Sequence, residues 1–105
     1  DLLKLVIDRH ADSSTEFNPL VTAAKTRLCR IYMSQKDYQK VLNTLSDSDV
    51  LTASLLELKG DAENQLGLYE LARVSYMRAL QNSPSQTSRA LINMKISDLE
   101  GEKIE

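Results

Sequence analysis

The chain has 105 residues, a formal net charge of −2 and 42% hydrophobic residues, with only three glycines and two prolines. This length suits one domain, or part of one, with a single modest core. The composition favours a folded helical chain over a disordered one. A nearly neutral charge excludes a basic field for nucleic acid and a polybasic patch for a membrane surface. The single cysteine, Cys29, cannot form an internal disulfide, so it does not identify the compartment.

The first predicted element is a short helix from Asp1 to about Ala11, with apolar residues on one face. These are Leu2, Leu3, Val6 and Ile7. We expect residues 1–12 to be the end of a preceding repeat, in a fragment of a longer protein that opens inside a helix. The apolar run is far too short to span a bilayer, and no signal-peptide pattern is present.

A helical hairpin is predicted over residues 19–48. Asn18 and Pro19 suit a helix start, because asparagine accepts free amide hydrogens and proline fits the first helical position. The first helix should end near Ser34. Its apolar stripe is Leu20, Ala24, Leu28 and Ile31, and the second helix carries Tyr38, Val41, Leu42 and Leu45.

A polar loop follows, and one of Asp47, Ser48 or Asp49 should cap the next helix. That helix is predicted to begin near Val50 and run to Leu66. Its stripe is Leu51, Leu55, Leu58, Ala62 and Leu66. A calcium loop is the alternative for the two aspartates, but the spaced ligands and the later glutamate are missing.

The clearest unit is the 34-residue stretch 53–86, with a tight turn at Gly67 and a second helix from Tyr69 to Asn82. Gly60 and Ala72 would let two antiparallel helices approach closely, and Tyr76 would fill the wedge beside the next helix. The small residues are Gly60, Ala72 and Ala79, the aromatic residue is Tyr76, and the closing proline is Pro84. Their spacing resembles a tetratricopeptide repeat, which has this period. Glu63 departs from the motif, which usually has tyrosine there.

An earlier, degenerate copy precedes this unit by 31 residues. The matching pairs are Cys29 and Gly60, Tyr38 and Tyr69, Val41 and Ala72, and Leu45 and Tyr76. A final helix over 87–101 should start near Ser85, hold Ala90, Leu91, Met94 and Leu99, and end at Gly101. It would cap the open end of the array. The predicted fold is therefore an all-α, tetratricopeptide repeat-like α-solenoid of about six helices.

Nothing in the chain forms a converging catalytic set, so we expect a protein that is not an enzyme and needs no cofactor or metal. His10 is the only histidine, and Asp8 and Asp12 do not complete a helical metal-ligand pair with it. Cys29 stands where the repeat needs a small residue. A small buried hydrophobe is favoured there over a reactive thiol.

The candidate functional surface is the inner face, which the first helix of each pair lines in tetratricopeptide arrays. By position the candidate protein-binding residues are Thr26, Arg30, Met33, Glu57, Asp61, Asn64, Leu91 and Lys95. We call this set the inner surface. Its mixed charge does not reproduce the lysine–asparagine–arginine clamp of co-chaperone repeats. The alternative is that Glu57 and Asp61 merely form a solvated face.

Four segments together resemble the carboxyl-terminal region of YfgM-like proteins, ancillary subunits of the bacterial SecYEG translocon. They are residues 26–30, 58–61, 71–76 and the closing Met94-Lys95-Ile96-Ser97-Asp98-Leu99. Leu51 stands where members often carry tryptophan. The resemblance implies an inner-membrane helix upstream of Asp1 and a location on the periplasmic side. It also implies two partners, the translocon and a periplasmic prolyl-isomerase-type chaperone. A tetratricopeptide scaffold or co-chaperone of a cytosolic assembly is the alternative.

Overall fold

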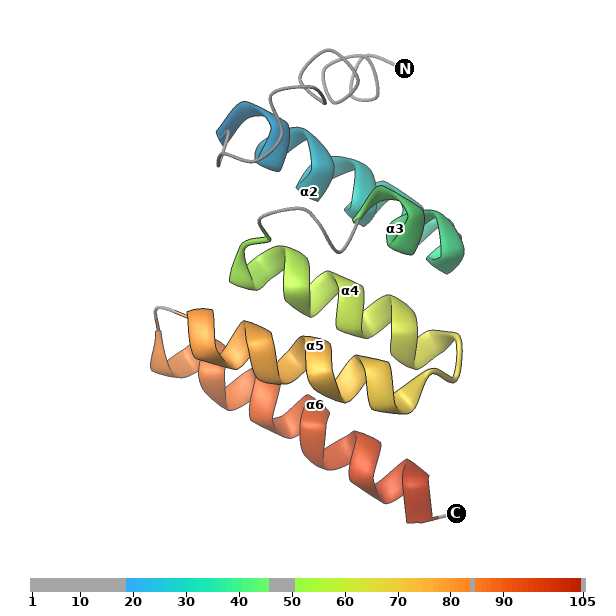
Figure 1. Ribbon diagram of the computed structural model, residues 1–105, viewed down its shortest axis with the longest axis vertical. Helices are drawn as coiled ribbons and strands as arrows, with labels where there is room; N and C mark the ends of the chain where they lie inside the picture. Colours follow the sequence, from blue (N-terminus) through green and yellow to red (C-terminus); the bar gives the residue numbers. More distant parts are fainter. Residues whose placement is uncertain (1–18, 46–50, 84, 105) are drawn as a thin grey trace.

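The computed structural model describes residues 19–45, 51–83 and 85–104, and these form five helices without a strand. The helices are α2 (Pro19–Ser34), α3 (Tyr38–Thr44), α4 (Ala53–Gln65), α5 (Tyr69–Asn82) and α6 (Gln86–Ile104). They stack in chain order as two antiparallel hairpins followed by α6 (Figure 1). The predicted all-α solenoid is confirmed. The predicted helix over 1–11, the Asn18 cap, Pro84 and the loop at 46–49 lie outside the described residues.

Both hairpin turns have the same backbone geometry, 31 residues apart. The second residue after the first helix of each hairpin lies in the left-handed region. It is Lys36 with φ 62° after α2 and Gly67 with φ 79° after α4. Glycine adopts this conformation without strain, whereas lysine has a Cβ that opposes it. The closing bonds run from Asp37 N–H to the Tyr32 carbonyl at 2.9 Å, and from Leu68 N–H to the Glu63 carbonyl at 2.8 Å. This six-to-one bond is the Schellman closure, so the two turns match in detail.

The core consists of two clusters that meet at α4. The first contains Leu28, Cys29, Tyr32, Val41, Leu45, Leu55 and Ala62, and the second contains Leu56, Ala72, Tyr76, Ala79, Ile92 and Leu99. The adjacent residues Leu55 and Leu56 belong to different clusters, so α4 is apolar on two sides. This helix lies between the first hairpin and the pair α5–α6 (Figure 1).

Two predicted helix boundaries are wrong. Helix α4 begins at Ala53, not near Val50, because the Thr52 side chain accepts a hydrogen bond from Leu55 N–H at 3.2 Å and caps the helix. The predicted caps at 47–49 lie outside the described residues. Helix α6 passes through Gly101 to Ile104, since that glycine does not adopt the positive φ that would end it.

Several predicted stripe residues face solvent instead of the core. On α2, Leu20 and Ile31 are exposed, and Cys29 and Tyr32 are buried in their place. On α6 the exposed residues are Ala90, Leu91 and Met94, and Ile92 and Leu99 are buried. Leu66 follows the end of α4 and is also exposed. These helices carry apolar residues on more than one face, so periodicity alone does not fix their rotation.

Among the helices in the described ranges, none combines the length and the apolar character that a membrane crossing requires.

Candidate functional site

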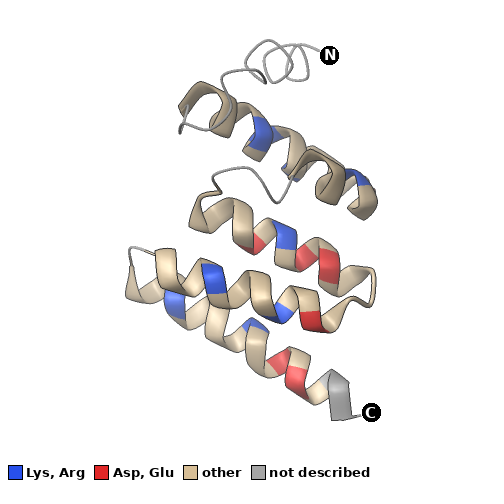
Figure 2. Cartoon of the chain, viewed as in Figure 1, with Lys and Arg blue, Asp and Glu red and all other residues tan. Residues whose placement is uncertain are grey.

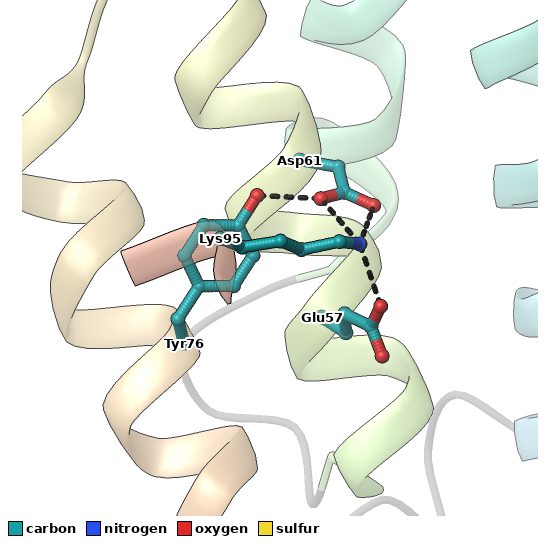
Figure 3. A network of polar contacts seen from close by, with 4 residues as sticks. All are labelled: Glu57, Asp61, Tyr76 and Lys95. Carbon is teal, nitrogen blue, oxygen red and sulfur yellow. Dashed lines mark hydrogen bonds and ion pairs between the residues drawn. The ribbon is translucent and has the colours of Figure 1, made fainter. Parts of the chain in front are cut away.

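The inner surface contains a network of charged side chains that joins α6 to α4. The Lys95 ammonium lies 2.6 Å from Glu57 Oε2 and 3.0 and 3.1 Å from the two carboxylate oxygens of Asp61 (Figure 3). Glu57 and Asp61 stand one turn apart on α4, so both carboxylates point the same way. The three side chains are about one-third exposed. One cation from the last helix thus neutralises much of this carboxylate pair.

Tyr76 of α5 completes the network. Its hydroxyl donates a hydrogen bond to Asp61 Oδ1 at 2.5 Å, and its ring centroid lies 5.8 Å from the Lys95 nitrogen. Burial raises the pKa of Tyr76, and the bond to Asp61 raises it further. Burial lowers the pKa of Lys95, but the hydrogen bonds and charges of Glu57 and Asp61 outweigh burial and the pKa is raised. At neutral pH the ammonium and the phenol therefore keep their protons, and the network is an ion-pair lock between helices.

The structure thus brings three of the predicted inner-surface residues together: Glu57, Asp61 and Lys95. The alternative interpretation of Glu57 and Asp61 as a solvated face does not describe them, because both accept from Lys95. The sequence placed these residues on one surface but did not predict the ion pairs. Because Lys95 is one cation between two carboxylates, this part of the inner surface keeps one net negative charge.

The other inner-surface residues divide by accessibility. Arg30 and Leu91 are exposed, the latter by 51%. Thr26 is half-buried and donates to the Thr22 carbonyl at 2.8 Å. Met33 and Asn64 are half-buried, and Met33 packs against the first core cluster. Arg30 and Leu91 are therefore the members best placed to meet a partner.

A buried polar pair was not predicted from the sequence. Glu63 and Ser75 are 3% and 2% exposed, and the Ser75 hydroxyl donates to Glu63 Oε1 at 2.5 Å. The sequence feature that could have indicated this pair is Glu63, because the repeat motif usually has tyrosine at that position. Tyr32 occupies the equivalent position of the first hairpin, so the second hairpin replaces a buried ring with a carboxylate.

Cys29 is fully buried, as the small-residue position predicts. Burial raises the pKa of its thiol to about 11, and the nearby charge of Lys25 only partly opposes this shift. The thiolate is the reactive form of cysteine. This environment therefore favours a packing role.

Over the described ranges, no group of three histidine, cysteine, aspartate or glutamate residues is arranged to hold a metal ion. In Figure 2, α2 and α3 show basic residues without acidic ones, whereas α4, α5 and α6 carry residues of both signs. The polar chemistry of the inner surface is suited to contacts with mixed-charge groups of a protein.

The family model described as a tetratricopeptide repeat-like domain matches residues 3–101. Comparison with curated proteins finds no match, and neither does comparison with solved structures.

Proposed function

Because the chain belongs to the tetratricopeptide repeat-like domain family, whose members typically bind proteins and are generally non-catalytic, we propose that it is an interaction module of the bacterial cell envelope. It assists protein translocation at the SecYEG translocon, on the periplasmic side of the inner membrane. Its partners are the translocon and a periplasmic prolyl-isomerase-type chaperone. The assignment to YfgM-like proteins comes from the four segments that resemble them.

One structural observation supports this proposal above others. The closing segment Met94–Leu99, the most particular part of the resemblance, supplies the lysine that binds Glu57 and Asp61. It also supplies Leu99 to the second core cluster. The segment thus has a structural role in the domain. A structural role of this kind is expected of a sequence segment that members of one family share.

The inner surface is the proposed contact. At its centre on α4, Glu57 and Asp61 are held in place by Lys95 and keep one net negative charge. Arg30 on α2 and Leu91 on α6 lie exposed on the two flanking helices. Rigid placement lowers the entropy lost on binding. An exposed cation on one helix and an apolar side chain on another would orient a partner segment more than they would raise its affinity.

The test is the double variant Arg30→Glu/Leu91→Lys in the full-length, membrane-anchored protein. Lys95 stays intact, because a third carboxylate beside Glu57 and Asp61 would disturb the fold. After a thermal melt confirms folding, co-purification with the translocon and the chaperone is measured. We expect recovery of both to fall severalfold, and Lys40→Glu, a charge reversal on α3, to leave recovery unchanged. Undiminished recovery would discard the inner surface as the contact.

The cytosolic scaffold remains the competing function. It differs from the envelope proposal in a simple observation on the complete gene. A transmembrane span shortly upstream of the present first residue favours the envelope module. A long cytosolic array of further repeats in that place would overturn it.

A further inference from the structure

A second surface lies between the two hairpins, on α3, α4 and α5. A groove of about 530 Å³ is lined by four apolar side chains. They are Leu42 of α3, Leu45 directly after α3, and Leu71 and Val74 of α5. Three charged side chains complete its lining: Lys59, Glu63 and Arg78. We call this the outer groove. No residue of α6 and no candidate residue of the inner surface contributes to it.

The groove exists because the two hairpins differ in length and in one buried residue. Helix α3 has 7 residues and α5 has 14, and Leu42 of α3 lines the groove together with Leu71 and Val74 of α5. In addition, Glu63 stands where the first hairpin has the ring of Tyr32. The carboxylate is held at the bottom by Ser75 and fills less space than tyrosine.

The apolar residues along this edge of α5 are not required by the hairpin. Leu68, Leu71 and Val74 are 40%, 53% and 53% exposed and share one face of the helix. The residues at the equivalent positions of the first hairpin are Asp37, Lys40 and Asn43, all polar. Since the first hairpin closes with the same turn geometry, the fold does not explain the exposed apolar residues. Contiguous exposed apolar surface of this kind marks interaction sites.

Charge selects among the possible occupants. The Glu63 carboxylate is buried and already accepts from Ser75, so it offers little to a ligand. The Arg78 side chain is exposed on α5, one turn beyond Val74, and Lys59 lines the opposite wall from α4. An occupant therefore meets apolar walls and a guanidinium at one end. Arginine pairs well with carboxylates through its planar fork.

We propose that the outer groove binds a segment of a partner protein in which leucine-like side chains stand next to an acidic residue. The apolar side chains enter between Leu42 and Leu71, and the carboxylate pairs with Arg78. This site is separate from the inner surface, so one chain is able to hold two protein segments at once. It does not depend on the identity of the envelope partners.

The test uses a fluorescent synthetic peptide of leucine and glutamate, titrated into the whole chain. Two counterparts carry lysine in place of glutamate, or serine in place of leucine. We expect saturable binding of the first peptide and much weaker binding of both counterparts. Equal binding of the lysine peptide would overturn the charge argument, and no binding of any peptide would overturn the site.

The variant Leu71→Lys/Val74→Asn carries the residues of the first hairpin at these positions and should fold. It is expected to weaken binding by at least roughly tenfold, equivalent to about 1.4 kcal/mol. Arg78→Glu should weaken the glutamate peptide and favour the lysine peptide. The matched control is Met94→Lys, an exposed apolar residue on α6, which should leave binding unchanged.

Self-association is tested by sedimentation of the chain alone. A dimer that forms with rising concentration and is lost in Leu71→Lys/Val74→Asn would assign the groove to a second copy and overturn the partner proposal. A monomer that still binds the glutamate peptide supports it. Loss of envelope partners in the inner-surface variant does not bear on this result, because the peptide assay contains no envelope component.

Discussion

A Cβ placed on Gly60 would lie 2.6 Å from Tyr76 Cε1 and 2.7 Å from Cδ1. Non-bonded carbon atoms do not approach this closely. The position of the Tyr76 ring therefore requires glycine at position 60, where α4 and α5 cross. The ring has no free space to move into, because Tyr76 is 1% exposed and its hydroxyl is bound to Asp61. The predicted roles of Gly60 as a close-approach residue and Tyr76 as a buried wedge are confirmed.

We predict that Gly60→Ala destabilises the fold despite the better helix propensity of alanine. Propensity favours alanine by about 1 kcal/mol, whereas overpacking a core costs about 1–3 kcal/mol. Because a 2.6 Å approach is closer than real Cβ contacts, the overpacking cost should lie in the upper part of that range. The expected net loss is then roughly 1–2 kcal/mol in a urea melt. Gly101→Ala is the matched control, since no atom lies within 4 Å of its Cβ position, and it should gain up to about 1 kcal/mol. A Gly60→Ala variant as stable as the parent would contradict the tight contact between the ring and the glycine.

We predict that Lys95→Met lowers stability by about 1.5 kcal/mol, because Glu57 and Asp61 then face each other without a cation. Hydrogen bonds to charged groups contribute about 1.5–3 kcal/mol, and partial exposure favours the lower end. Arg73→Met is the control, since its ion pair with Glu70 spans 3.8 Å at the surface and should change stability by under about 0.5 kcal/mol. Equal melts of the two variants would show that the lock contributes nothing.

The contribution of the Lys95 ion pairs to stability depends on pH, because the pKa of Lys95 is raised in the folded state. A lysine whose pKa is higher in the folded state stabilises the fold fully below the unfolded value of 10.5 and loses this contribution as pH rises above it. The stability difference between parent and Lys95→Met should therefore be constant near neutral pH and shrink in the alkaline range. The same pair of melts, repeated across pH, measures this.

We predict that Cys29 is inert toward a thiol reagent under native conditions and reacts quickly in denaturant. The side chain is fully buried, and burial raises the pKa of the thiol from 9.0 to about 11. Since the unfolded thiol ionises first, this residue lowers stability as pH rises from 9.0 to about 11. Cys29→Ala should remove that part of the alkaline loss. Equal labelling rates in native and denatured protein would place the thiol at the surface.

The hairpin over 53–86 was predictable because its signals are local. Gly67 permits the left-handed turn, and Gly60, Ala72 and Tyr76 set the crossing by size. The turn at Lys36 was harder to predict, because lysine gives no signal for a positive φ. The rotation of α2 and α6 was also missed. Apolar residues on several faces make it depend on neighbours that only the assembled structure shows.

For three residues of the candidate site, the sequence predicted a shared surface but not the contacts between them. Position in the repeat placed Glu57, Asp61 and Lys95 on one surface. The ion pairs between them join residues 34 and 38 positions apart, so they depend on how α6 lies against α4. The outer groove was missed altogether. We attribute the groove to two differences between the hairpins, the short α3 and the absence of a ring at Glu63. These differences are recognised only when the two hairpins are compared in the structure.

The last prediction concerns Glu63→Tyr, which restores the residue that the first hairpin has as Tyr32. There the Lys40 nitrogen lies 5.7 Å from the ring centroid of Tyr32, and the residue equivalent to Lys40 in the second hairpin is Leu71. A tyrosine at position 63 should therefore place its ring beneath Leu71 and fill the outer groove. We expect the variant to be about as stable as the parent, because removing a buried carboxylate offsets the loss of the hydrogen bond from Ser75. Affinity for the leucine–glutamate peptide should fall by roughly tenfold or more.

The matched control for Glu63→Tyr is Gln65→Tyr, which adds the same side chain at an exposed position of α4 outside the groove lining. It should bind the peptide as the parent does. Urea melts and the peptide titration are run on both variants. If Glu63→Tyr is folded and binds the peptide as tightly as the parent, the peptide lies elsewhere. If the variant is strongly destabilised, the ring does not fit as it does at Tyr32, and the account of the groove as the space of a missing ring is wrong.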